Sequence, residues 1–199
     1  MKIIIIGGTG TIGKAVVKEL SPRHEIIIVG HKRGDVQADI TNEASIKQMF
    51  KKIGKFDALV ATTGEVKFGP LTELTAEHYQ IGIDSKLMGQ VNLVLQGLNT
   101  INDGGSFTLT SGILSHDPIR YGSSATMVNA ALEGFVIAAA IEMPRSIRIN
   151  IVSPTVLTES QDKFADYFRG FEPAPASRVA LAYSRSVEGA QTGKIYKVE

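Results

Sequence analysis

The sequence predicts an α/β fold in which a parallel β-sheet carries helices on both faces, giving three layers. Short runs of β-branched and aliphatic residues alternate with longer stretches of helical periodicity, an alternation typical of parallel strands joined by crossover helices. Most of the short runs are continuously apolar, as strands buried on both faces should be. The chain has 199 residues and no internal repeat or linker, so we expect a single domain spanning residues 1–199.

Each expected strand is a short run rich in β-branched residues, and helical periodicity follows it. The first strand is an isoleucine run that stops at two glycines, and the helix after it is amphipathic. In chain order, the expected strands are Lys2–Ile6, Glu25–Val29, Ala58–Ala61, Ser106–Thr110, Arg148–Val152 and Gly193–Val198. The expected helices are Thr11–Leu20, Glu43–Ile53, Ala76–Asn99, Ala125–Glu142 and Ala176–Ser186.

One crossover helix, the one after the second strand, is predicted to be missing. Only eight residues, His31 to Ala38, separate that strand from Asp39, whereas a parallel connection normally takes a dozen or more. A short strand around Val36–Ala38 would therefore be reached through an irregular loop. Asn42 or Thr41 then caps the next helix, and the carboxylate that follows suits the helix dipole.

Composition and charge exclude several classes of function. The net charge of +1 creates no global field for nucleic acid or an anionic membrane, so we expect neither as a partner. Without cysteine there is no disulfide framework, thiolate zinc site or cysteine nucleophile, which suits a reducing compartment. The four histidines lack ligand spacing, so no metal is expected. The apolar run Ile3–Ile6 is too short for a membrane span or signal peptide, and we expect a cytoplasmic protein.

A glycine-rich loop connects the first strand to the first helix. Residues without side chains let the backbone approach a pyrophosphate, and the helix N-terminus faces the anion. This context predicts a Rossmann-like, doubly wound fold that binds a dinucleotide through Gly7, Thr9, Gly10, Thr11, Ile12 and Gly13. The alternative is a tight turn in which glycine serves only positive φ and close packing. An overlapping P-loop pattern ends in Ala15 instead of a Mg²⁺-binding hydroxyl residue, which disfavours a nucleoside triphosphatase.

The type of dinucleotide is suggested by the end of the second strand, where an acidic residue would bind the adenosine ribose 2′-hydroxyl. This chain instead has His31, Lys32 and Arg33 there. Because cations suit a 2′-phosphate, NADP(H) is preferred over NAD(H). The alternative is a solvated loop whose charges are incidental.

Several motifs together resemble the short-chain dehydrogenase/reductase family over essentially the whole length of the chain. The glycine loop is similar to the family's TGxxxGxG segment, Thr110-Ser111 to its Ser-Ser pair, and residues 147–154 to its IRVNxVSPG. Asp39-Ile40 is similar to the Asp-Val pair that contacts adenine, and residues 61–64 to the Asn-Asn-Ala-Gly turn. The resemblance implies cofactor contacts at Asp39, Ile40, Ala61, Thr62, Thr63, Gly64, Pro154, Thr155 and Val156.

The family's catalytic pair, a tyrosine followed four residues later by a lysine, is absent from this chain. A nearby cation stabilises the phenolate, so both residues matter to general acid/base catalysis. An alignment anchored on residues 129–135 puts Asn129 at the lysine position and Ala125 at the tyrosine position. An alignment anchored on Tyr121 puts Ala125 at the lysine position. The resemblance is therefore to a short, bacterial-type subgroup with a degenerate Tyr-x-x-x-Lys active site.

Four residues are candidates for the chemistry. Ser111 retains its family position and would bind the substrate oxygen, and Tyr121 lies ten residues later in a loop. Lys86 occupies the position of the family's relay asparagine, and we hypothesise that it faces Asn129 near the nicotinamide ribose. The alternative for Ser111 is a structural role in a turn, and the alternative for Lys86 is an ordinary surface position.

Two functions remain open from the sequence. The first is an NADP(H)-dependent oxidoreductase that transfers hydride to or from a small carbonyl or alcohol substrate with non-standard acid/base residues. The second is a catalytically inactive NADP(H)-binding sensor or partner subunit. Aromatic residues 164–171 either cover the substrate or dock a short helix. By resemblance, a homodimer or homotetramer through the two long helices is expected.

Overall fold

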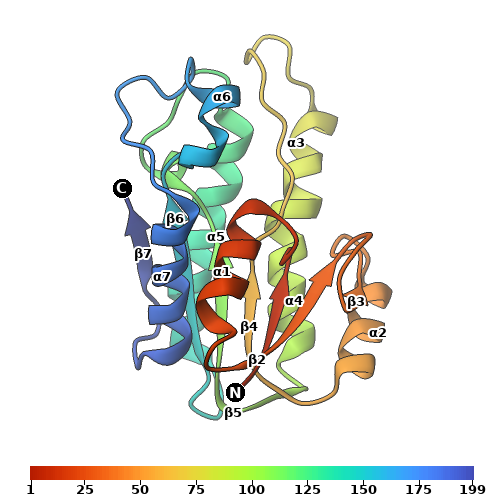
Figure 1. Cartoon of the computed structure of the whole chain (residues 1–199). Helices are drawn as coiled ribbons and strands as arrows, with labels where there is room; N and C mark the ends of the chain where they lie inside the picture. The colour runs from red at the N-terminus through yellow and green to blue at the C-terminus, as the bar shows by residue number, and fades with distance from the viewer.

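Seven parallel strands form a single sheet in the computed structural model, which describes residues 1–199 (Figure 1). Their order is β3-β2-β1-β4-β5-β6-β7. The strands are β1 (Lys2–Ile6), β2 (Glu25–Gly30), β3 (Val36–Gln37), β4 (Phe56–Ala61), β5 (Ile101–Thr110), β6 (Arg148–Pro154) and β7 (Ile195–Val198). The order reverses direction between β1 and β4, which places a crevice at the carboxyl ends of these strands. The predicted Rossmann-like, doubly wound α/β fold is confirmed.

Helices cover both faces of the sheet. α1 (Thr11–Leu20) and α7 (Ala176–Glu188) lie against one face. The other face carries α2 (Glu43–Ile53), α4 (Gly89–Gly97) and α5 (Ser123–Glu142). Five short helical elements complete the chain: α3 (Ala76–Gly82), η1 (Ile83–Met88), η2 (Ile113–Ser115), η3 (Thr158–Ser160) and α6 (Gln161–Phe164).

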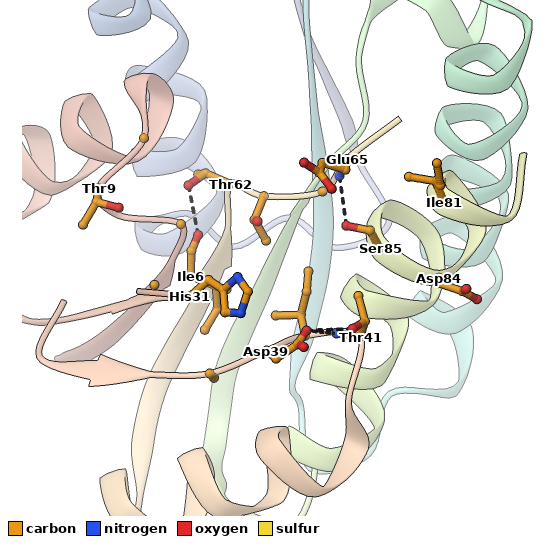
Figure 2. Close-up of a pocket in the computed structure, with 17 residues that line it drawn as sticks. Ile6, Thr9, His31, Asp39, Thr41, Thr62, Glu65, Ile81, Asp84 and Ser85 are labelled. Carbon is orange, nitrogen blue, oxygen red and sulfur yellow. Dashed lines mark hydrogen bonds between the residues drawn. The ribbon is translucent and has the colours of Figure 1, made fainter. Parts of the chain in front are cut away.

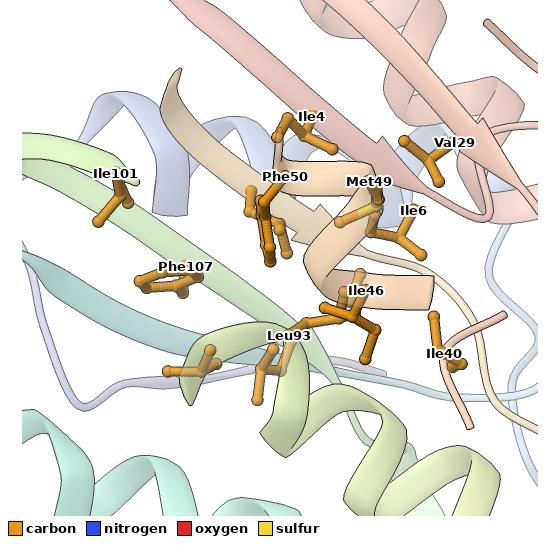
Figure 3. Close-up of a cluster of buried hydrophobic side chains, with 14 of the residues drawn as sticks. Ile4, Ile6, Val29, Ile40, Ile46, Met49, Phe50, Leu93, Ile101 and Phe107 are labelled. Carbon is orange, nitrogen blue, oxygen red and sulfur yellow. The ribbon is translucent and has the colours of Figure 1, made fainter. Parts of the chain in front are cut away.

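The isoleucine run of β1 supplies both hydrophobic cores because its side chains alternate between the two faces. Ile4 and Ile6 belong to the larger cluster of 24 buried residues (Figure 3). Ile3 and Ile5 belong to the cluster of 14 residues under α1 and α7. A continuous apolar run is thus explained by burial on both sides.

The missing crossover is confirmed. β3 pairs with β2 through only two residues, and no helix intervenes. The loop is held by Asp35, whose carboxylate accepts a hydrogen bond from the Ile28 N–H at 2.8 Å. Asn42 caps α2, because its Oδ1 accepts hydrogen bonds from the N–H groups of Ala44 and Ser45.

The predicted continuous helix Ala76–Asn99 is wrong, because a π-helical segment, η1, separates α3 from α4. The fully buried Gln90 accompanies this change: its Nε2 donates to the carbonyls of Lys86 at 3.1 Å and Thr110 at 2.9 Å. The Thr110 N–H donates back to Gln90 Oε1 at 2.8 Å. These bonds tie the helix to β5, a tertiary constraint that helical periodicity does not reveal. π-turns of this kind are frequent at functional sites.

Candidate functional site

A cleft of about 740 Å³ opens at the carboxyl ends of β1, β2 and β4 (Figure 2). Most of its lining is polar or glycine. Residues of the glycine loop, the β2–β3 loop, the turn after β4 and the η1 helix surround it. The lining consists of Ile6, Gly7, Thr9, Gly10, Gly30, His31, Ala38, Asp39, Ile40, Thr41, Thr62, Thr63, Gly64, Glu65, Ile81, Asp84 and Ser85.

The glycine loop forms one wall of the cleft and leads into α1. A Cβ at Gly13 would lie 2.1 Å from the Gly7 carbonyl oxygen, so only glycine lets the first turn of α1 approach the strand this closely. The first turn of α1 carries no acidic residue and no side-chain cap. Its free N–H groups and the helix dipole therefore favour an anion in the cleft.

The outer end of the cleft combines one carboxylate with basic residues. Asp39 accepts hydrogen bonds from the Thr41 hydroxyl at 2.7 Å and the Thr41 N–H at 2.9 Å. These bonds, with a smaller contribution from the charge of His31, hold the pKa of Asp39 below its ordinary value. Lys32 and Arg33 follow His31 on the same exposed loop. Asp39 and His31 line the cleft, whereas Lys32 and Arg33 lie outside the lining on the same loop.

Lys86 lies on η1 beside the inner end of the cleft. Its backbone and side-chain stem cover Gly64, where an added Cβ would lie 2.7 Å from the Lys86 Cα. The side chain is half-buried and no carboxylate forms a salt bridge with it. Burial lowers the pKa of Lys86 from 10.5 to about 8. The ammonium can therefore lose its proton much closer to neutral pH than a surface lysine can.

Asn129 lies on α5 at the carboxyl end of the sheet and is 4% exposed. Its Nδ2 is close to Gly112, where an added Cβ would lie 3.2 Å away. Its Oδ1 has no hydrogen-bond partner, so no direct hydrogen bond joins it to Lys86. The buried hydroxyl of Thr155, after β6, is also unpaired. Unpaired buried polar atoms are rare, and these two suit a ligand with hydrogen-bond donors.

Ser111 and Tyr121 both lie outside the lining of the cleft. The buried Ser111 directs its hydroxyl to the Glu133 carboxylate at 2.7 Å. Tyr121 is 41% exposed, with a left-handed φ of 66°, and its ring meets that of Tyr167 edge-on at 6.0 Å. Lys86 is also outside the lining, but it lies against Gly64 and follows Ser85, and both of these residues line the cleft.

Comparisons with known proteins agree with this geometry. A family model described as enoyl-(acyl carrier protein) reductase matches residues 10–194. The chain belongs to the short-chain dehydrogenase/reductase family. An Escherichia coli member, 2,3-dihydro-2,3-dihydroxybenzoate dehydrogenase, is 28% identical over 58% of this chain and 50% of its own length. The Pseudomonas putida 1,2-dihydroxy-1,2-dihydronaphthalene dehydrogenase is 30% identical over 69% of this chain and 53% of its own length.

Two solved structures cover the whole of this short-chain dehydrogenase/reductase. A Listeria innocua protein is 55% identical, with a TM-score of 0.99 and complete coverage of both chains. A small-chain dehydrogenase in complex with NADPH is 26% identical, with a TM-score of 0.89 over 100% of this chain and 96% of its own. Family membership is shown for this chain, and the second structure shows NADPH bound by a relative.

The lining of the cleft contains only part of the cofactor set that the family resemblance implied. Predicted residues outside it are Thr11, Ile12, Gly13, Lys32, Arg33, Ala61, Pro154, Thr155 and Val156. Sequence reasoning missed the members contributed by α3 and η1 and by neighbours of predicted residues. These are Ile6, Gly30, Ala38, Thr41, Glu65, Ile81, Asp84 and Ser85. Proximity to Asp39 and to the end of β2 could have indicated Ala38, Thr41 and Gly30, whereas nothing local marks the η1 residues.

Proposed function

We propose that this chain is an NADP(H)-dependent oxidoreductase that acts on a carbonyl or alcohol group with proton-handling residues other than a tyrosine–lysine pair. The observation that carries the proposal is the cleft, which runs from the free N-terminus of α1 to the neighbours of Lys86. A dinucleotide has its pyrophosphate at such a helix N-terminus. The cradle formed by Gly7 and Gly13 suits this group, because glycine lets the backbone approach the phosphates.

The preference for NADP(H) rests on the β2–β3 loop. His31, Lys32 and Arg33 are all exposed there, where they are free to contact a 2′-phosphate. NADPH and NADH are titrated by nucleotide fluorescence, which is clean because the chain has no tryptophan. We expect NADPH to bind at least about tenfold more tightly, since one charge-assisted contact contributes roughly 1.5–3 kcal/mol.

A double variant tests the source of this preference. Lys32→Glu with Arg33→Glu should remove most of the preference and leave NADH affinity within about twofold. The control, Lys67→Glu, changes an exposed lysine on a different loop and should leave both affinities unchanged. Equal weakening of NADPH and NADH binding would contradict the assigned role of these cations.

The bound dinucleotide supplies or accepts the hydride. Lys86 is the ionisable residue best placed to exchange the proton, because burial brings its pKa to about 8 and no carboxylate holds its charge. Asn129 Oδ1 and the Thr155 hydroxyl are both buried and unpaired, which supports a role for them in accepting hydrogen bonds from the bound molecule. General acid/base catalysis by a side chain contributes about 10²–10⁴-fold, so Lys86→Gln should lower kcat by at least that lower limit.

Turnover separates this proposal from an inactive NADP(H) sensor. The oxidation of bound NADPH is followed with a panel of small carbonyl compounds, and the reverse reaction with alcohols and cyclic diols. Turnover that depends on Lys86 supports the oxidoreductase. Tight NADPH binding without turnover across the panel would favour the sensor, and failure to bind either nucleotide would exclude both.

Aromatic side chains support a ring-bearing substrate. Phe68, on the loop before α3, meets Phe164 of α6 at a ring-centroid distance of 6.1 Å, and both segments lie beyond the carboxyl ends of the strands (Figure 1). The Tyr121–Tyr167 pair adds a second contact of this kind. Aromatic walls favour flat apolar ligands, and two relatives are named for cyclic dihydrodiols. Phe164→Ala should raise KM for cyclic diols more than for short aliphatic alcohols.

We also propose that two copies associate through α4 and α5. The outer face of α5 exposes Ile137 at 50% and Ile141 at 86%, and α4 exposes Leu95 at 49%. An 18-residue window of α5 has a mean hydropathy of 1.5 with only 33% of it buried, which is long and apolar enough for a membrane span by composition alone. Contiguous exposed apolar residues indicate an interaction surface. Ile141→Glu should shift sedimentation toward the monomer.

A further inference from the structure

A chain of hydrogen bonds connects the end of β5 to the surface of the protein. Ser111 Oγ donates to Glu133 Oε1 at 2.7 Å, and Ser115 Oγ donates to the same oxygen at 2.8 Å. Ser115 Oγ also contacts His116 Nδ1 at 3.0 Å. His116 Nε2 contacts Glu199 Oε1 at 2.9 Å. The series begins at the buried Ser111 and ends at an imidazole whose side chain is 32% exposed.

The number of protons restricts how these contacts are satisfied. Ser115 has one hydroxyl proton but contacts two groups that can accept it. In one arrangement Ser115 donates to an ionised Glu133, and a doubly protonated His116 donates to Ser115. In the other, a protonated Glu133 donates to Ser115, which donates to a neutral His116. In both, Nε2–H donates to the Glu199 carboxylate, so the two arrangements differ by the transfer of one proton through Ser115.

We infer that Ser111, Glu133, Ser115 and His116 form a proton wire between solvent and the carboxyl end of β5. This inference rests on the proposed function for its use in turnover. A proton that leaves Ser111 is replaced from Glu133, then from Ser115, and finally from Nδ1 of His116. His116 regains a proton from water, and alcohol oxidation moves each proton in the opposite direction. No additional reductant is required by these transfers.

The position of Ser111 suits this role. Its N–H donates to the Val152 carbonyl at 2.9 Å, which fixes the residue between the ends of β5 and β6. The next residue, Gly112, lies against Asn129. In this scheme Glu133 and His116 touch no substrate, so they are positioning and relay groups. Lys86 lies on η1, whereas the wire runs from the end of β5 to Glu133 on α5.

The charged groups around His116 are few. Glu199 is its direct partner, and Lys197 Nζ lies 3.9 Å from the Glu199 carboxylate. Arg178 donates to the main-chain oxygen of Glu199 at 2.6 Å. Asp117 is the adjacent residue and is exposed. Glu133 is connected to His116 only through the Ser115 hydroxyl, so its effect on His116 should depend on that hydroxyl.

The first test needs neither cofactor nor turnover. The ring ¹⁵N signals of His116 are followed by NMR as a function of pH in the wild type, Glu133→Gln, Ser115→Ala and the double variant. We expect Glu133→Gln to move the titration midpoint of His116 when Ser115 is present, and to move it much less when residue 115 is alanine. Equal movement in both backgrounds, or none in either, would overturn the wire.

The second test uses turnover. Ser115→Ala and His116→Ala should each lower kcat about tenfold or more, with the KM for NADPH within about twofold, and added imidazole should restore the rate of His116→Ala only. Ser123→Ala is the control, since that hydroxyl pairs with Tyr79 at 2.8 Å outside the series. Loss of rate without imidazole rescue would indicate a structural role. If NADPH does not bind, the proposed function fails while the NMR result still judges the wire.

Discussion

Replacing Lys86 with methionine should stabilise the protein at neutral pH. Burial lowers the pKa of Lys86 from 10.5 to about 8, so the folded state binds the proton more weakly than the unfolded state does. At about 1.4 kcal/mol per pKa unit, the charged side chain destabilises the fold by at most about 3.5 kcal/mol. The side chain is only half-buried, and solvent screening reduces this to about 1–2 kcal/mol. Methionine fills a similar volume without a charge.

The pH dependence distinguishes this explanation from improved packing. Below pH 8, lysine is charged in both states and the full advantage of Lys86→Met is present. As the pH rises from about 8 to 10.5, the native lysine loses its proton first, so wild-type stability increases relative to the variant and the advantage disappears. Urea unfolding at pH 7, 9 and 10.5 measures the difference in free energy of unfolding between Lys86→Met and the wild type. Lys67→Met, at an exposed position, is the control. A gain that persists at pH 10.5, or a loss at pH 7, refutes the reasoning.

Three further predictions concern other parts of the fold. Hydrogen bonds from Arg23, and then Ser184, lower the pKa of Glu188 from 4.5 to about 2. After solvent screening, Glu188→Gln should lower the free energy of unfolding by about 0.5–1 kcal/mol at pH 7. Urea titrations should show this difference vanish as the pH falls from about 4.5 to 2. Asn42→Ala removes the cap of α2 and should cost about 1 kcal/mol by thermal unfolding; an unchanged Tm contradicts it. Gly13→Ala should abolish NADPH binding, because its Cβ would lie 2.1 Å from a carbonyl oxygen; retained affinity in the fluorescence titration would show that the loop relaxes.

Local patterns determined the fold class and many element boundaries. The isoleucine run of β1, the glycine loop and the cap at Asn42 each act within a few residues, so their signals are complete in the sequence. The short connection between β2 and β3 could be predicted from chain length alone, because it lies within the eight residues from His31 to Ala38, which are too few for a crossover helix. Family motifs added Asp39, Thr62, Thr63 and Gly64, all of which line the cleft.

Only the tertiary structure decided which side chains meet at the site. The π-turn at η1 accompanies hydrogen bonds between Gln90 and Thr110, residues that are 20 positions apart. The same turn brings Ser85 to the cleft and places Lys86 over Gly64. Ser111 directs its hydroxyl to Glu133, 22 residues away, because α5 carries that carboxylate past the end of β5. Residue identity thus determined the scaffold and its dinucleotide loop, whereas proximity and burial determined which groups hold protons and at what pH they release them.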